Sequence, residues 1–587
     1  MRAPSTERSV PGAAFLLVFA LCLGATLAPP AVRAAAPAPA TSSRGMVASP
    51  QADATLAGAL VLRAGGNAVD AAVATSLALS VTDPHHSGLG GGAFLLLRLA
   101  DGRAVAIDAR ETAPAAATRD MFVAPGVPER ASQLGALAVA TPGLVAGLAL
   151  ALERYGTRSF AELAAPAVRL AEEGFVVGPS HAAAAGFWQK AGLAERFPDT
   201  AAIQLPPDGT PMARGHRLVQ RDLARTLRLL AEQGPAVFYR GELAGRIADE
   251  VRRRGGVLSA DDLARYEPKL REPVRGSYRG LEVLSFPPPS SGGVALVQML
   301  NVLEGFDLAA RGAGSSASWH VIAEAMKLAF ADRQAFLGDA DFVSVPVAAL
   351  TSRAYAEALR ARIDPPRWRR APWTWGRDEV AIAVDGPGEP PRGAGTTHFS
   401  VTDAAGNAAS VTQTINLLYG SGITVPGTGI ILNDEMDDFA TAPGQANAFG
   451  LVATSEANAV APGKRPLSSM TPTIVLKDGR TRLVTGSPGG PRIITTTLLT
   501  VLNVVDYGMD ASEAVAATRL HHQWRPDVLE VEPPTPRDVI EGLRRRGHEV
   551  KVGDREWASA QLVTVDPITE LHAGASDPRS DGAACGP

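Results

Sequence analysis

The character of the sequence changes at residues 393–401, which read Gly-Ala-Gly-Thr-Thr-His-Phe-Ser-Val. Three small residues end a flexible stretch, and from Thr396 polar and apolar residues alternate, which is typical of a β-strand. A second alternating run covers 409–415, and residues 403–407 (Asp-Ala-Ala-Gly-Asn) supply turn formers between the two runs. The sequence therefore predicts a β-hairpin that starts directly after a loop.

The stretch before this hairpin, from about residue 363 to 395, contains Asp-Pro-Pro at 364–366, three tryptophans among arginines and several further prolines. Such a stretch can sustain neither a helix nor a central strand, so we expect it to lie exposed. It divides the chain into two parts. The part upstream, from about residue 51 to 360, has a mostly helical pattern, and the part downstream begins with strands.

The upstream part carries recognisable helix and strand signals. Helices are predicted at residues 52–63 and 68–79, separated by Gly65-Gly66. Ser159 with Glu162 and Ser259 with Asp262 have the spacing of capping boxes, and the first of these helices should end near Gly174. A long helix is predicted at 318–336, and strands at 93–99 and 281–286.

Composition excludes several classes of protein. The chain has 587 residues, 46% hydrophobic and 20% charged, which is ordinary for a globular protein large enough for several layers. The 56 basic and 60 acidic residues leave a formal net charge of −4, so nothing indicates a nucleic-acid partner. Two cysteines are too few for a disulfide scaffold or a thiolate metal cluster.

The N-terminus is typical of a secretory signal. Arg2 and Arg8 precede an apolar run from about residue 13 to 27, and small residues follow up to residue 36. We therefore expect 1–36 to be a signal peptide that directs the protein to the periplasm or the medium. Cys22 would leave with it. No later segment reaches about 18 uninterrupted apolar residues, so no stable membrane span is predicted.

Several common catalytic motifs are missing, including the HExxH metal motif, the CxxC pair, the phosphate-binding lysine loop and the Gly-x-Ser-x-Gly elbow. The glycine-rich residues 88–92 lack a preceding strand and a following helix, so we interpret them as a tight turn. The pairs His85-His86 and His521-His522 are interpreted as packing or hydrogen-bonding residues, because sequence neighbours rarely face one metal ion.

What remains is a threonine at the start of a strand. A threonine hydroxyl is a poor nucleophile and needs an adjacent base. Its own α-amine, with an unperturbed pKa of about 7.7–8.0, can act as that base if the chain is cut immediately before the residue. Thr396 has the flexible residues 393–395 before it and a strand after it. From these residues alone, an ordinary strand-initiating threonine remains the alternative.

Motifs along nearly the whole chain remove that ambiguity. They are LRAGGNAVDAA at 62–72, DARETAP at 108–114, PPPSSGG at 287–293, TTHFSV at 396–401, NDEMDDF at 433–439, KRPLSSM at 464–470, GSPGG at 486–490 and HHQW at 521–524. In this order they strongly resemble the γ-glutamyltransferases, also called glutathione hydrolases, of the N-terminal-nucleophile hydrolase superfamily. The resemblance implies an α+β fold, a four-layer αββα sandwich, and no metal or organic cofactor.

The resemblance also implies how the chain matures and reacts. The precursor would split into a large chain, 37–395, and a small catalytic chain, 396–587, which remain together as a heterodimer. Thr396 would be both the autoprocessing residue and the nucleophile, with Thr414 orienting its hydroxyl. Gly489 and Gly490 would offer backbone N–H groups to the oxyanion.

The substrate implied by the resemblance is the γ-glutamyl group of glutathione and related compounds, which is passed to water or to an amino acid or dipeptide acceptor. Its α-carboxylate suits a bidentate arginine with hydroxyl donors, and its α-ammonium suits acceptor side chains. The resemblance assigns the carboxylate to Arg110, Ser468 and Ser469, and the ammonium to Asn416, Glu435 and Asp438.

Some positions depart from the family pattern. Leu417 and Leu418 stand where small or polar residues are frequent, Pro491 where serine is common, and Phe449 where many relatives have a tyrosine in the lid loop over the glutamyl pocket. These changes affect expected substrate preference more than mechanism. Two other functions remain open: a glutaryl or cephalosporin acylase of the same superfamily, and an exported, catalytically silent binding scaffold.

Overall fold

The predicted hairpin lies inside a seven-stranded sheet. Strand β10 (Ala394–Asp403) pairs antiparallel with β11 (Ala408–Leu417). Asp403 closes the turn, because its Oδ1 accepts hydrogen bonds of 2.9 Å from the backbone N–H groups of Ala405 and Asn407. The hairpin prediction is confirmed. The sheet has the order β21-β2-β10-β11-β3-β4-β7. Its other five strands are β21 (Ala583–Cys585), β2 (Gly45–Ser49), β3 (Gly92–Arg98), β4 (Ala104–Ala109) and β7 (Lys269–Arg271).

The computed structural model describes residues 1, 36–363, 394–442, 444–452 and 454–587. The expected signal peptide and nearly all of the proline-rich stretch before the hairpin lie outside the described residues. Residues 38–587 form one unit, to which the following description refers.

A second seven-stranded sheet faces the first one. Its order is β1-β20-β19-β15-β14-β9-β8, from β1 (Ala40–Ser42), β20 (His572–Ser576), β19 (Gln561–Val565), β15 (Arg480–Gly486), β14 (Thr473–Lys477), β9 (Leu281–Ser285) and β8 (Val274–Tyr278). All of its strand pairs are antiparallel. Strands from before and after residue 395 therefore lie side by side in both sheets.

Side chains of β3 show how the layers pack. Leu95 and Leu97 pack in the cluster that joins this sheet to its helices, whereas Phe94 and Leu96 pack in the cluster between the two sheets. The rings of Phe94 and Phe286 stack there with centroids 4.0 Å apart. This two-residue alternation is expected of a strand buried on both faces.

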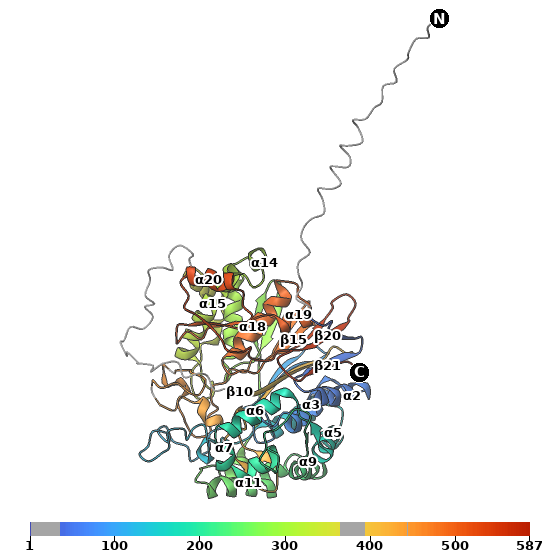
Figure 1. Cartoon of the computed structure of the whole chain (residues 1–587), viewed down its shortest axis with the longest axis vertical. Helices are drawn as coiled ribbons and strands as arrows, with labels where there is room; N and C mark the ends of the chain where they lie inside the picture. Colours follow the sequence, from blue (N-terminus) through green and yellow to red (C-terminus); the bar gives the residue numbers. More distant parts are fainter. Residues whose placement is uncertain (2–35, 364–393, 443, 453) are drawn as a thin grey trace. The chain divides into compact units, whose positions relative to one another are not determined.

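Helices cover the outer face of each sheet (Figure 1). One side is covered by α2 (Ala52–Arg63), α3 (Ala68–Thr82), α4 (Leu144–Tyr155), α5 (Phe160–Glu173) and α9 (Arg221–Gln233), and the other by α13 (Gly292–Leu303), α15 (Ser316–Phe336), α18 (Arg492–Val505) and α19 (Ala511–Ala516). The helix–sheet–sheet–helix order confirms the predicted αββα sandwich.

Within the described residues, further α-helices and short strands accompany the two sheets and the helices named above. They are α6 (Pro179–Lys190), α7 (Leu193–Arg196), α8 (Pro198–Gln204), α10 (Val237–Arg240), α11 (Glu242–Arg253), α12 (Ala260–Arg265), α14 (Leu308–Arg311), α16 (Val347–Leu350), α17 (Arg353–Arg360), α20 (Arg537–Arg545), β5 (Phe175–Val176), β6 (Arg217–Leu218), β12 (Thr424–Val425), β13 (Ile430–Ile431), β16 (Leu520–His521), β17 (Leu529–Val531) and β18 (Val550–Val552).

Capping residues explain where the helices begin. Both predicted capping boxes are present: Ser159 with Glu162 opens α5, and Ser259 with Asp262 opens α12. Helix α15 begins two residues before the predicted start, because the Ser315 side chain accepts a hydrogen bond of 3.1 Å from the Ser318 N–H and so caps the helix earlier.

Candidate active site

Thr396 faces the space between the two sheets. Along β10, Phe399 and Val401 pack toward the helices, so residues 396, 398 and 400 point to the opposite face. The inner layer is polar at this end: His398 Nδ1 lies 2.8 Å from Thr412 Oγ1. Thr396 itself is 5% exposed, and a shift of the β10–β11 register between Gly395 and Thr396 marks the position.

Thr414 on β11 contacts both sides of the Gly395–Thr396 peptide bond. Its Oγ1 lies 3.0 Å from the Thr396 Oγ1 and donates a hydrogen bond of 2.6 Å to the carbonyl oxygen of Gly395. The Thr414 Oγ1 also accepts a 2.9 Å hydrogen bond from the Asn416 N–H. Because the Thr414 hydroxyl donates its own proton to the Gly395 carbonyl oxygen, the Thr396 hydroxyl must donate to Thr414. Thr414 therefore lies within hydrogen-bonding distance of the Thr396 hydroxyl that it was predicted to orient.

Gly489 and Gly490 lie in the loop between β15 and α18. Their φ angles are +130° and +58°, a region that favours glycine. Their carbonyl groups accept from the N–H groups of Arg492 and Ile493 at 3.2 and 3.1 Å, at the start of α18. The glycine amides therefore lie at the positive end of a helix dipole, where developing negative charge is stabilised. Pro491 is the N-cap residue of α18.

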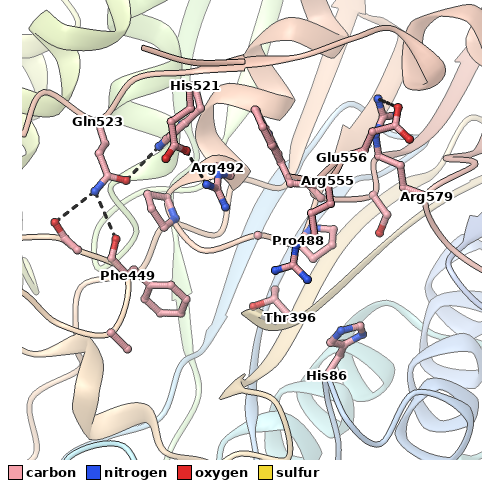
Figure 2. A pocket seen from close by; sticks show the side chains of 18 of the residues that line it. His86, Thr396, Phe449, Pro488, Arg492, His521, Gln523, Arg555, Glu556 and Arg579 are labelled. Carbon is pink, nitrogen blue, oxygen red and sulfur yellow. Dashed lines mark hydrogen bonds and ion pairs between the residues drawn. The ribbon is translucent and has the colours of Figure 1, made fainter. Parts of the chain in front are cut away.

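A cavity of about 830 Å³ opens at Thr396 (Figure 2). Thr396 and Gly489 both line it, so the predicted nucleophile and one predicted oxyanion donor share one space. Phe449 lies on one side, and in Figure 2 the Arg555 side chain extends toward Thr396. The other charged residues of the wall are Asp83, Glu129, Arg130, Arg492, Glu530, Lys551, Glu556 and Arg579.

The predicted ligands of the glutamyl head group form a separate buried cluster. Arg110 follows β4 and is 1% exposed. Its guanidinium donates to the carboxylates of Glu435 and Asp438, both on the 3₁₀ helix Glu435–Asp438. The structure thus joins the residue expected to bind the carboxylate with two residues expected to bind the ammonium. Burial lowers the pKa of Arg110, but the carboxylates outweigh burial and raise it overall.

Sequence reasoning missed Glu111. This carboxylate is fully buried, with its Oε2 3.7 Å from Arg110 Nη1. Burial outweighs the attraction of Arg110 and raises the pKa of Glu111 to about 7; burial also raises the pKa of Glu435. Three carboxyl groups therefore surround one guanidinium. No local pattern distinguished Glu111 from its neighbours in the 108–114 motif.

Asn416 connects the two parts of the site. Its backbone N–H donates to Thr414, and its side-chain Nδ2 donates a 3.0 Å hydrogen bond to the carbonyl oxygen of Asp434, next to Glu435. Its φ of +77° is unusual for a residue other than glycine. Asn416 thus holds the end of β11 against the segment that carries the acidic residues.

Ser468 and Ser469 precede β14, and a second missed residue lies behind them. Ser468 Oγ accepts a 3.1 Å hydrogen bond from the Met470 N–H. Arg333, near the end of α15, donates to Ser469 Oγ at 3.3 Å and to Ser291 Oγ at 3.0 Å. Burial lowers the pKa of Arg333 to about 10, which shows how little charge compensation it has.

Phe449 lines the cavity that contains Thr396 and Gly489. A Cβ atom on Gly490 would lie 2.5 Å from the Phe449 Cδ1, so the ring packs on the glycine backbone. The Gln523 side chain holds this segment by donating to the carbonyl oxygens of Phe449 and Gly450 at 3.3 and 3.2 Å. Asn447 borders both the main cavity and a second cavity of about 20 Å³, which Asp438 and Arg333 also border.

Leu417 and Leu418, which depart from the family pattern, lie at the end of β11 and directly after it. Leu417 ends β11 and pairs with Ala394, and Leu418 packs in the helix-side cluster.

Residues 88–92 form the turn between α3 and β3 that was expected, with the Gly91 N–H donating to the Gly88 carbonyl at 3.0 Å. His521 bonds Thr495 and Gln523, as expected of a hydrogen-bonding histidine.

The chain is similar to known proteins along most of its length. The family model described as gamma-glutamyltranspeptidase matches residues 54–586. The chain belongs to the gamma-glutamyltranspeptidase family. A glutathione hydrolase proenzyme of Escherichia coli (strain K12) is 46% identical over 567 residues, covering 95% of each chain. The Acylase ACY 1 proenzyme of Pseudomonas sp. (strain SE83) is 42% identical over 552 residues, covering 93% of this chain and 94% of its own.

A related protein of solved structure has the same fold as this member of the gamma-glutamyltranspeptidase family. The cephalosporin acylase from Bacillus halodurans superposes with a TM-score of 0.81 at 31% identity, covering 93% of this chain and 96% of the acylase. Within the described residues of the chain, no helix is long and apolar enough to cross a bilayer.

Proposed function

We propose that this chain is a precursor that cuts itself between Gly395 and Thr396 and then acts as a γ-glutamyltransferase and glutathione hydrolase. In the first step, the Thr396 hydroxyl attacks the Gly395 carbonyl carbon, and the peptide bond rearranges to an ester that water hydrolyses. The hydrogen bond of Thr414 to the Gly395 carbonyl oxygen supports this step, because it stabilises the negative charge that develops there.

The cut would leave a small chain of 192 residues, 396–587. The part of β10 that follows the cut lies between β2 of the large chain and β11 of the small chain, and β14 pairs with β9 of the large chain. Separation of the chains would break both sheets. We therefore infer that the large chain, 37–395, and the small chain, 396–587, remain one folded heterodimer.

In the mature form, the freed α-amine of Thr396 would serve as the base. The hydroxyl attacks the γ-carbonyl carbon of glutathione, an ester forms, and cysteinylglycine leaves with a proton. Water or the amine of an amino acid or dipeptide acceptor then releases the glutamyl group. The Gly489 and Gly490 amides would hold the oxyanion in both steps, and such a donor is typically worth about 3–4 kcal/mol.

The observation that carries the substrate assignment is the charge of the buried cluster. One guanidinium, Arg110, faces the two carboxylates of Glu435 and Asp438. A zwitterionic α-amino-acid head group matches these charges. Its carboxylate would replace Glu435 and Asp438 as the ion-pair partner of Arg110, and its ammonium would pair with the two carboxylates so released. Asn416, Ser468 and Ser469 would complete the subsite with neutral hydrogen bonds.

A glutaryl acylase is the second candidate, since relatives named acylases cover most of the chain. A glutaryl group carries a carboxylate but no α-ammonium, so it would leave Glu435 and Asp438 uncompensated. The two functions separate on one pair of substrates, L-γ-glutamyl-p-nitroanilide and glutaryl-p-nitroanilide, which share the leaving group. We expect kcat/KM to favour the glutamyl compound at least about 100-fold, and a preference for the glutaryl compound would establish the acylase.

Intact-mass spectrometry tests the maturation. The purified parent should give two chains, the smaller beginning at Thr396, whereas Thr396→Ala should remain a single chain. Two chains from Thr396→Ala would mean that another protease makes the cut. The N-terminal sequence of the large chain would also report whether residues 1–36 are removed, as expected of a cleaved secretory signal.

A further inference from the structure

A cluster of metal-ligand side chains lies on the other face of β10. Asp83, His85 and His86 follow α3, and one ligand atom of each lies within 4.8 Å of the others. The Asp83 Oδ1 is 2.9 Å from His86 Nδ1 and 3.3 Å from His85 Nε2. We propose that these three side chains bind one divalent transition-metal ion of the zinc class.

The state of the His85 ring points to a missing ligand. This side chain is 0% exposed, yet within the described residues neither of its ring nitrogens makes a hydrogen bond. His181 of α6 is also buried without a hydrogen bond to its ring, and its ring centroid is 4.6 Å from that of His85. Buried polar atoms are rarely left without a hydrogen-bond partner, because burying them unsatisfied is costly. A metal ion would satisfy His85.

The turn that carries the cluster is held in place by the surrounding backbone. The N–H groups of His86 and Ser87 donate to the Asp83 carbonyl at 3.0 and 3.1 Å, and the Tyr419 N–H donates to the His85 carbonyl at 3.0 Å. The second carboxylate oxygen of Asp83 accepts from the Thr397 hydroxyl. Such outer contacts orient metal ligands. The turn thereby brings two adjacent histidines to one carboxylate, although sequence neighbours rarely share an ion.

The donor set indicates the kind of ion. Two imidazoles and one carboxylate suit Zn²⁺ and similar ions, which often keep a fourth position for water. Asp83 and His86 also line the cavity that contains Thr396, so the fourth position would be reachable from solution. Figure 2 shows His86 beside this cavity, near Thr396.

A second histidine cluster lacks these properties. His320 Nδ1 and His548 Nε2 are 2.8 Å apart, so each satisfies the other, and the ammonium group of Lys327 is 3.3 Å from the carboxylate of Glu324. The neighbouring cation already neutralises the one carboxylate that a metal ion would need. The site after α3 is therefore the one we assign.

The test is calorimetric titration of tag-free, chelator-stripped protein with ZnCl₂. The parent should bind one Zn²⁺ per chain through this site, and His86→Ala and His85→Leu should each weaken that binding at least about 10-fold. The control His216→Ala, on a half-buried histidine outside the cluster, should bind like the parent. Absence of Zn²⁺ binding by the parent, or equal affinity in His86→Ala, would overturn the assignment.

Two further measurements guard against a folding defect in the variants. Zn²⁺ should raise the thermal midpoint of the parent and of His216→Ala but not that of His86→Ala, because only binding to the folded state stabilises. Co²⁺ should give the intense visible absorption of four-coordinate cobalt with the parent. An equal Zn²⁺-dependent shift in His86→Ala would refute the site even if its titration were ambiguous.

Discussion

The hydroxyl of Thr414 donates a 2.6 Å hydrogen bond to the carbonyl oxygen of Gly395, the group that Thr396 must attack for the chain to cut itself. The same hydroxyl lies 3.0 Å from the Thr396 hydroxyl. One side chain on the neighbouring strand therefore contacts both the attacking oxygen and the oxygen on which charge develops. Strand pairing between β10 and β11, which sets Thr396 opposite Thr414, creates this relationship.

Replacing Thr414 should consequently slow maturation. Thr414→Val keeps the shape but removes the donor, so we expect cleavage to become slower on the order of 100-fold, the usual effect of losing one oxyanion donor. Thr414→Ser keeps the hydroxyl and serves as the matched control. The time course of chain separation on denaturing gels measures the effect, with circular dichroism to verify folding. Cleavage of Thr414→Val at the parent rate would exclude the role.

Arg110 should control substrate affinity. If it holds the α-carboxylate, Arg110→Lys should raise KM for L-γ-glutamyl-p-nitroanilide about 100-fold, because the bidentate contact is lost while the charge remains. Arg110→Ala should also unfold more easily, by about 3–5 kcal/mol, since it leaves buried carboxylates without a cation. Steady-state kinetics and urea denaturation separate the two effects. An unchanged KM in folded Arg110→Lys would remove this residue from the substrate site.

The fold could be read largely from local patterns together with the family resemblance. The alternation after Thr396 predicted the hairpin, and the serine–acid spacings predicted two helix starts, because both signals depend only on residues close in sequence. The start of α15 was misplaced because Ser315 caps the helix ahead of its apolar pattern.

The residues of the candidate site were named from the family resemblance, but their contacts with one another were not predicted. Arg110, Glu435 and Asp438 were expected to bind opposite ends of a substrate, and their pairing with one another arises because the fold buries them together. Glu111 and Arg333 had no local signature. Long-range packing alone brings Arg333 from α15 to Ser469, 136 positions further along the chain.

Arg333 should position the serines rather than bind the substrate directly. Its guanidinium contacts Ser291 and Ser469, so Arg333→Met should raise KM about 10-fold by releasing Ser469 while leaving kcat within about twofold, the loss expected for one hydrogen bond to a charged group. Removing a buried cation with little compensation should also stabilise the protein or leave its thermal midpoint unchanged. Ser469→Ala should show the same KM, and the double variant no further increase. Additive increases of KM in the double variant would mean that Arg333 does not act through Ser469.

Glu111 should make stability depend on pH. Its pKa is about 7 in the folded chain and 4.5 as the ordinary value, because burial disfavours the charged form. The folded state therefore holds a proton that the unfolded state releases, and stability falls as pH rises from about 4.5 to about 7, by roughly 3 kcal/mol at most. Glu111→Gln cannot ionise and should escape this loss.

Urea unfolding of the uncut Thr396→Ala chain, with and without Glu111→Gln, measures the effect at pH 4.5 and pH 8. The Gln variant should gain stability relative to its parent as pH rises, with nearly all of the gain complete by about pH 8. Glu570→Gln, at an exposed position, is the matched control and should track the parent at both pH values. If the difference between the Glu111 pair were the same at pH 4.5 and pH 8, the Glu111 carboxyl would titrate near its ordinary pKa, and Arg110 would have to compensate its burial fully.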